Sequence, residues 1–268
     1  MSNITADLTM MIRAAEKAGR SLARDFGEVE RLQVSKKGPG DFVSAADKRS
    51  EEIIFEELKK ARSDYNFLME ESGAVGPQDE GYRWIVDPLD GTSNFLHGLP
   101  HWAISIALED LTKPKPEVVA GIVYDPVKNE LFKAEKGNGA FTGRKRLRVS
   151  SRRDPSEAMI AIGAPRRTEK QKTTFLKEYH SVLNYAPGLR RFGAASLDLA
   201  YVAAGRFDAF WERNLCSWDV AAGILLVSES GGFVCDVDSD QTNVVKSGNV
   251  LASNESFYAP LKKILRDI

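Results

Sequence analysis

The chain has 268 residues, of which 43% are hydrophobic and 28% charged, a composition typical of a globular protein and not of a disordered one. Its 37 Lys and Arg against 38 Asp and Glu give a formal net charge of -1, so overall charge does not attract it to nucleic acid or an anionic membrane. No apolar segment reaches the roughly 20 residues of a membrane-spanning helix, and the N-terminal residues do not resemble a signal peptide. We therefore expect a cytoplasmic protein.

The first half of the chain predicts two helices on a mostly antiparallel sheet. Apolar residues recur at helical spacing over 4–26. A second helix over about 44–62 begins where Ser44 and Asp47 have the spacing of a capping box, a structural role that would by itself explain Asp47. The predicted strands are 66–70, 84–86, 101–109, 117–124 and 130–135.

The segment WIVDPLDGTSNF, residues 84–95, predicts a buried strand that ends at a turn. Pro88 cannot donate to a sheet, so we expect the strand to end there, with Asp87 and Asp90 emerging together. Gly91 permits close approach of the backbone, and the hydroxyl and amide residues after it favour a helix start whose N–H groups bind anions. Carboxylates attract hard metal ions, so a magnesium-bridged phosphate ester suits this turn. Such a turn in isolation is more often only a turn.

The second half predicts a layered α/β unit, because strands and helices alternate there. We place the boundary near residue 145, which gives an N-terminal part over 1–145 and a C-terminal part over 146–268. The predicted strands are 158–162, 207–211, 232–237 and 250–253, and the predicted helices are 194–204, 218–230 and 256–266.

Five acidic residues lie at strand ends or helix starts: Asp47, Glu70, Asp87, Asp90 and Asp219. Each has a structural alternative, since Glu70 suits an exposed strand end and Asp219 suits the first turn of a helix. Together with a threonine hydroxyl they favour Mg²⁺ or Mn²⁺ over zinc, because hard cations prefer oxygen ligands.

The segments MEES at 69–72, DPLDGTSNF at 87–95 and WDVAAG at 218–223 resemble the three signature segments of the inositol monophosphatase family, in the same order. Met69 stands where the family often has glycine, which removes no ligand. The resemblance implies an α+β or α/β chain folded as a layered αβαβα sandwich of the sugar phosphatase type. It also implies a magnesium-dependent phosphate monoester hydrolase that is a lithium-sensitive homodimer.

Carried over to this sequence, the family's pattern implies two or three Mg²⁺ ions per site. Glu70, Asp87 and the carbonyl of Leu89 would bind one ion, and Asp87, Asp90 and Asp219 would bind a second. A third, weaker ion would lean on Glu70. Mn²⁺ is an alternative to Mg²⁺.

The resemblance also implies catalytic roles for Glu70, Thr92 and Asp47. Thr92 and Asp47 would take a proton from the attacking water, which Glu70 would help to position. The substrate would contact Asp90, Gly91, Thr92, Ala195, Glu212 and Asp219. The glycine-rich loop over 36–40 corresponds to a mobile flap in the family, so Lys36 or Lys37 would approach the substrate.

The motifs specify the superfamily better than the substrate. The chain most resembles enzymes acting on myo-inositol 1-phosphate, with histidinol phosphate, fructose 1,6-bisphosphate and adenosine 3′,5′-bisphosphate as alternatives. An additional regulatory role, through RNA polymerase or RNA, is suggested by some bacterial relatives and by a basic cluster of Arg144, Lys145, Arg146, Arg148, Arg152 and Arg153. Arg146 and Arg148 alternate with Leu147 and Val149, which favours an ordinary exposed strand face over a regulatory site. His97 and His101 suit packing or interface roles, and His180 suits a helix surface.

Overall fold

The computed structural model describes residues 6–28, 34–38, 41–164, 168–240 and 243–268, with the backbone alone over 34–38 and 41–44. Its helices are α1 (Ala6–Phe26), α2 (Ala45–Ala61), α3 (Thr92–Leu96), α4 (Glu169–Tyr185), α5 (Ala195–Ala203), α6 (Ser217–Glu229), α7 (Val244–Ser247) and α8 (Glu255–Arg266), with a 3₁₀ turn at Pro155–Glu157. Its strands are β1 (Val34–Gly38), β2 (Asp41–Ser44), β3 (Asn66–Met69), β4 (Gly73–Val75), β5 (Tyr82–Asp90), β6 (Ala103–Asp110), β7 (Glu117–Asp125), β8 (Glu130–Glu135), β9 (Gly139–Thr142), β10 (Lys145–Arg146), β11 (Met159–Ile162), β12 (Gly188–Arg190), β13 (Ala209–Glu212), β14 (Phe233–Asp236) and β15 (Val250–Ser253).

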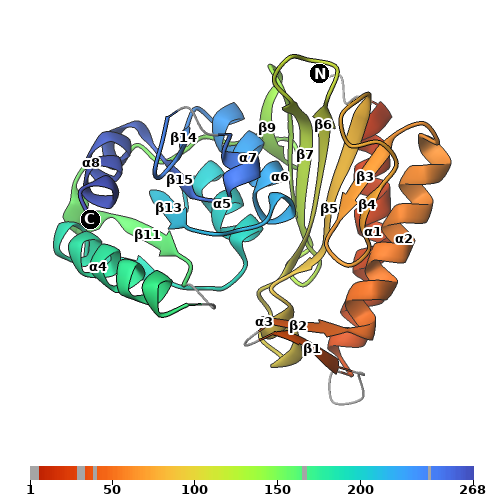
Figure 1. Cartoon of the computed structure of the whole chain (residues 1–268), viewed down its shortest axis with the longest axis horizontal. Coiled ribbons are helices and arrows are strands. Elements are labelled where there is room, and N and C mark those ends of the chain that lie inside the picture. The colour runs from red at the N-terminus through yellow and green to blue at the C-terminus, as the bar shows by residue number, and fades with distance from the viewer. Residues whose placement is uncertain (1–5, 29–33, 39–40, 165–167, 241–242) are drawn as a thin grey trace.

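These elements form five layers, seen edge-on in Figure 1. Helices α1 and α2 cover the outer face of an eight-stranded sheet, and α5 and α6 lie between that sheet and a five-stranded one. Helices α4 and α8 form the last layer. The predicted αβαβα sandwich is therefore confirmed. Among the residues that the structure describes, no helix is both long and apolar enough to cross a membrane.

The larger sheet has the order β10-β9-β8-β7-β6-β5-β3-β4. Only the β3–β5 pair is parallel, so the expected antiparallel character is confirmed. Every residue of β6 is buried, because helices cover both faces of the sheet at its centre. The apolar runs in the sequence reflect this two-sided burial.

Pro88 does not end the strand, contrary to the sequence-based expectation. Strand β5 continues to Asp90, and its pairing with β6 is irregular between Asp87, opposite Ser105, and Asp90, opposite Ala103. At this bulge the backbone of residue 88 does not have to donate a hydrogen bond to β6. Proline, which has no N–H group, is tolerated in a sheet at such bulges. The hydroxyl of Ser50 on α2 donates to the carbonyl of Pro88 at 2.8 Å and holds the bulge in place.

The smaller sheet has the order β12-β11-β13-β15-β14, in which β11 is parallel to β12 and β13 and the other pairs are antiparallel. Helix α4 lies on the outside of this sheet and buries Glu178 and Val182. The sequence predicts a helix around His180 but not the bounds of that helix. The loop expected over 36–40 includes part of a hairpin formed by β1 and β2. Its residues 39 and 40 lie outside the described residues.

The central helices α5 and α6 pack closely against the larger sheet. Gly121 of β7 faces α6, and a Cβ atom there would lie 3.0 Å from the Cα atom of Ala222. One hydrophobic cluster joins Ile85 of the larger sheet to Leu197 of α5 and Val220 of α6, so it includes residues from both sides of position 145. The two-part division at 145 stays a prediction.

Candidate active site

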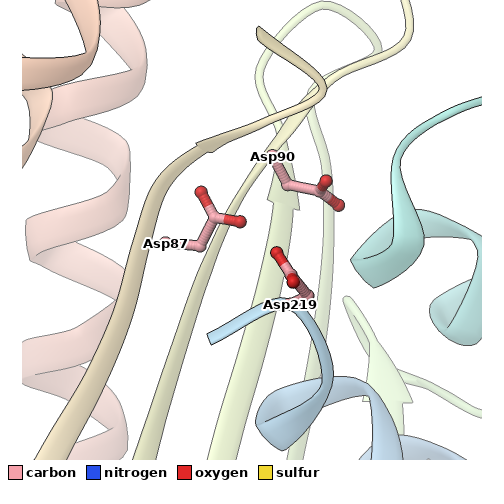
Figure 2. A group of neighbouring side chains, drawn as sticks. All are labelled: Asp87, Asp90 and Asp219. Carbon is pink, nitrogen blue, oxygen red and sulfur yellow. The ribbon is translucent and has the colours of Figure 1, made fainter. Parts of the chain in front are cut away.

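Three carboxylates gather where β5 ends and α6 begins (Figure 2). Asp87 and Asp90 come from β5 and Asp219 from the first turn of α6, and each offers an oxygen within 4.8 Å of the others. Asp87 and Asp90 are buried and Asp219 is half-buried. Asp87 and Asp90 are neighbours in the sequence, and the fold brings the distant Asp219 to them.

Backbone hydrogen bonds orient two of these carboxylates. The N–H of Leu89 donates to Oδ1 of Asp87 at 3.0 Å, and the N–H of Cys216 donates to Oδ2 of Asp219 at 2.6 Å. Asp219 therefore fills the structural role of a helix-start acid and also faces the cluster. The two interpretations of Asp219 do not exclude each other.

The electrostatics of the cluster fit a divalent cation. Burial raises the pKa of Asp87 well above its usual value, and the charges of Glu70, Asp90 and Asp219 raise it further, as does a hydrogen bond with Glu70. Crowded carboxylates repel one another unless a cation compensates their charge. Oxygen donors at this spacing suit a hard ion such as Mg²⁺.

Thr92 and Asp47 meet beside the cluster. The hydroxyl of Thr92 lies 2.9 Å from Oδ1 of Asp47 and 3.0 Å from the carbonyl oxygen of Leu89, so it can donate to either. Asp47 is fully buried in the first turn of α2. The side chain of Ser44, its expected capping partner, lies outside the described residues. The fold thus places the Asp47 carboxylate against the metal-type turn.

Gly91 shapes the backbone between the carboxylates and α3. Its φ of 91° is a conformation that favours glycine, and a Cβ atom there would be crowded, at 3.1 Å from the carbonyl oxygen of His101. It is the N-cap of α3 and provides no side-chain cap. Thr92 to Asn94, expected as capping residues, lie inside the helix instead. The start of α3 nevertheless adjoins the carboxylates, as expected.

The predicted substrate residues Ala195 and Glu212 belong to α5 and β13, two elements that contact each other. Ala195 begins α5, and the next residue, Ser196, donates to Oδ2 of Asp90 through its N–H at 2.7 Å and through its hydroxyl. Glu212 is half-buried at the end of β13. Burial, and then the charges of Glu212 and Asp90, raise the pKa of Asp198 on α5 well above its usual value.

Sequence reasoning missed residues that hold the site in place. Glu51, which is 3% exposed, accepts hydrogen bonds from the N–H of Glu71 at 2.8 Å and from the hydroxyl of Ser72, and so fixes the loop after Glu70. Its helical spacing of four residues from Asp47 was an available signal, because both belong on one face of α2. Ser196 carried no local signal.

For the other candidate residues, the side-chain contacts that the structure describes are with groups outside the three carboxylates. In the basic segment, Arg152 pairs with Asp208 at 2.9 Å, and the guanidinium of Arg146 lies 5.9 Å from the ring centre of Phe141. His101 packs against aromatic rings, as expected of a packing residue. The side chains of Lys36 and Lys37 lie outside the described residues.

A layered αβαβα sandwich with clustered carboxylates at a strand end is the architecture of metal-dependent phosphate monoester hydrolases. The model of the inositol monophosphatase family matches residues 5–267, and the chain belongs to this family. Members of the family are phosphatases that hydrolyse phosphate monoesters and depend on a metal, generally Mg²⁺.

Relatives match over nearly the whole chain. The inositol-1-monophosphatase of Caulobacter vibrioides is 54% identical over 257 residues, which are 96% of this chain and 99% of the relative. The Nus factor SuhB of Haemophilus influenzae is 42% identical over 92% of this chain and 90% of the relative. The crystal structure of the extragenic suppressor protein suhB of Bartonella henselae superposes with a TM-score of 0.91 at 51% identity, over 97% of this chain and 98% of the other.

Proposed function

We propose that this protein releases phosphate from myo-inositol 1-phosphate by direct attack of water. The observation that carries this proposal is the cluster of Asp87, Asp90 and Asp219 beside the hydrogen-bonded pair of Thr92 and Asp47. The 54% identity to a relative named inositol-1-monophosphatase supports the choice of substrate.

Glu70, Asp87, Asp90, Asp219 and the carbonyl of Leu89 would hold two or three Mg²⁺ ions, or Mn²⁺ in their place. Metal ions held by these residues would supply polarisation of the phosphoryl oxygens, a lower pKa of the attacking water and stabilisation of the leaving oxygen. The crowding of charge on Asp87 supports this assignment, because it is relieved only by a proton or a cation.

The residues of the chain supply positioning and proton transfer. Thr92 receives a proton from the attacking water and passes it to Asp47, to which its hydroxyl is hydrogen-bonded at 2.9 Å. Glu70 orients the water, and the amides of Gly91 and Thr92 bind the phosphate at the start of α3. Ala195, Glu212 and Asp219 contact the polyol.

A substitution at Thr92 tests the proton path. Thr92→Val removes the hydroxyl and should lower kcat by about a hundredfold, the lower end of the usual effect of general acid–base catalysis. Thr92→Ser retains the hydroxyl and should keep most of the activity. Equal kcat for the two variants in a steady-state assay would exclude this role.

A panel of phosphate esters tests the substrate. With Mg²⁺ present, phosphate release should be most efficient for myo-inositol 1-phosphate. The panel also includes histidinol phosphate, fructose 1,6-bisphosphate and adenosine 3′,5′-bisphosphate. A higher kcat/KM for any of these three would replace the proposed substrate.

A second candidate function is regulatory binding to RNA polymerase or RNA, in addition to catalysis. A relative named Nus factor SuhB at 42% identity favours it, as do the exposed basic residues Arg144, Lys145 and Arg146. Arg152 contributes less to this surface because Asp208 engages it. A pull-down with RNA polymerase and a gel shift with RNA test the role, and absence of binding in both would dismiss it.

We also propose a cytoplasmic homodimer that lithium inhibits. Sedimentation at micromolar concentration should give twice the mass of the chain. Lithium should inhibit less as Mg²⁺ rises if the two ions compete for the carboxylate cluster. A monomeric mass or inhibition independent of Mg²⁺ would contradict the respective proposal.

A further inference from the structure

Gly163 and Glu212 lie side by side at the end of the parallel pair β11–β13. Ile162 is in register with Trp211, and the N–H of Gly163 donates to the carbonyl of Trp211 at 3.3 Å. The next positions along the two strands are therefore Gly163 and Glu212. A Cβ atom at position 163 would overlap the carboxylate carbon and both oxygens of Glu212. The Glu212 carboxylate thus lies directly over the Cα atom of Gly163.

The small size of glycine matters at position 163, whereas its backbone freedom does not. The φ of Gly163 lies outside the left-handed region, so other residues can adopt it. The group it would meet is the end of a flexible side chain, which can move. A cavity of about 530 Å³ is lined by both Gly163 and Glu212 and offers room for that movement. A side chain at 163 should therefore displace the Glu212 carboxylate and leave the fold intact.

The place of this carboxylate matters to the active site. Helix α5 packs against β13, the strand that ends at Glu212, and Ser196 in the first turn of α5 donates to Asp90 of the carboxylate cluster. A hydrogen bond weakens steeply with distance and angle. Displacing the Glu212 carboxylate therefore changes which hydroxyls it can accept.

We propose that Gly163 is a positioning residue that sets the preference for phosphate esters of polyhydroxylated alcohols. Its missing side chain lets the Glu212 carboxylate lie where it accepts hydrogen bonds from the hydroxyls of the alcohol. This inference rests on the proposed function, in which Glu212 binds the polyol.

The test compares kcat/KM for myo-inositol 1-phosphate with kcat/KM for phenyl phosphate, whose alcohol has no further hydroxyl. Gly163→Ala should lower the ratio of the two values about tenfold, mainly through the KM of the inositol ester, since one hydrogen bond to a charged group has about this strength. Gly27→Ala is the matched control, because among the described residues its Cβ would meet only the carbonyl oxygen of Arg24, at 3.4 Å. It should leave the ratio unchanged.

A double-mutant cycle separates the inference from its basis. Glu212→Ala should also lower the ratio, and adding Gly163→Ala to it should have no further effect, because both substitutions act through one carboxylate. If Glu212→Ala lowers the ratio and Gly163→Ala does not, the inference is wrong and the proposed function stands. An equal loss with both esters in Gly163→Ala would also overturn the inference. If Glu212→Ala leaves the ratio unchanged, the placement of Glu212 and the inference both fail.

Discussion

Asp90 illustrates how neighbouring residues determine what a carboxylate can do. Ser196 donates two hydrogen bonds to the same oxygen of Asp90, one from its N–H and one from its hydroxyl, and this fixes the orientation of the group. Residues that orient metal ligands in this way contribute to affinity although they do not touch the metal.

We expect Ser196→Ala to weaken Mg²⁺ binding by about tenfold, the lower end of the usual effect of losing a hydrogen bond to a metal ligand. The N–H of residue 196 still donates to Asp90, so the loss should be partial. Titration calorimetry measures the affinity. Ser230→Ala is the control, since Ser230 is fully buried and its hydroxyl donates to Leu226 within α6 and its cap. Equal affinities in the two variants would contradict the role of Ser196.

His101 predicts a pH dependence of stability. Burial and then the charge of Lys128 lower the pKa of His101 from 6.5 to about 4, and its Nε2 has no hydrogen-bond partner among the described residues. Below about pH 6.5 the unfolded chain takes up a proton that the folded protein does not, so this histidine's contribution is present above 6.5 and is lost as the pH falls toward 4.

We therefore expect the wild-type protein to lose more unfolding free energy between pH 8 and pH 5 than His101→Gln. At pH 8 the histidine is neutral in both the folded and the unfolded state. The difference in unfolding free energy between the wild type and His101→Gln at that pH therefore reports packing alone. Urea unfolding at both pH values measures the effect. An equal loss in the two proteins would show that His101 does not titrate in this way.

At the scale of elements, small residues let α6 approach the larger sheet. Ala107, Gly121 and Ala134 stand in one row across β6, β7 and β8, and Ala222 of α6 lies over Gly121. This close contact places Asp219, at the start of α6, beside the end of β5. The metal-type cluster therefore depends on helix-to-sheet distance.

We expect Gly121→Ala to lower the unfolding free energy by about 1–3 kcal/mol, the usual cost of overpacking, because the added Cβ meets the backbone of Ala222. Shifting α6 should also weaken Mg²⁺ binding. Chemical denaturation measures the unfolding free energy, and calorimetry measures Mg²⁺ binding. Gly27→Ala is the control, since it lowers the conformational entropy of the unfolded chain as any Gly-to-Ala substitution does, without a backbone clash among the described residues. Unchanged stability would mean that the layers adjust freely at this contact.

At the scale of the whole molecule, the candidate metal site exists only in the folded state. Asp87 and Asp90 belong to the larger sheet, and Asp219 belongs to a helix that also packs on the smaller sheet. An ion bound by all three connects these parts, and an ion that binds only the native state stabilises it.

Mg²⁺ at a hundredfold excess over its Kd should raise the unfolding free energy by about 2.7 kcal/mol. Asp219→Asn should reduce the shift by removing a charged ligand. Since the raised pKa of Asp87 makes protons compete with the ion, the shift should be smaller at pH 5 than at pH 8. Thermal unfolding with Mg²⁺ and with EDTA measures it. A shift that persists unchanged in Asp219→Asn would place the ion elsewhere.

Local patterns predicted much of this molecule. The apolar runs gave the central strands, and the segment around Asp87 and Asp90 indicated a metal-type turn, because turn chemistry depends on adjacent residues. The continuation of β5 through Pro88 was not predicted, since it depends on a bulge against β6. Ser196 was also missed, because its partner Asp90 lies 106 residues away in the chain.

The sequence alone determined the chemistry available to this protein, namely oxygen ligands, a hydroxyl and a glycine-opened helix start, and it identified the family. The tertiary structure decided which of these groups meet. It placed Asp219 against Asp87, Thr92 against Asp47, and the Glu212 carboxylate over Gly163. The physical reason is that such contacts depend on how the layers pack. Packing brings together segments that are far apart in the chain, and their separation in sequence does not predict their distance in space.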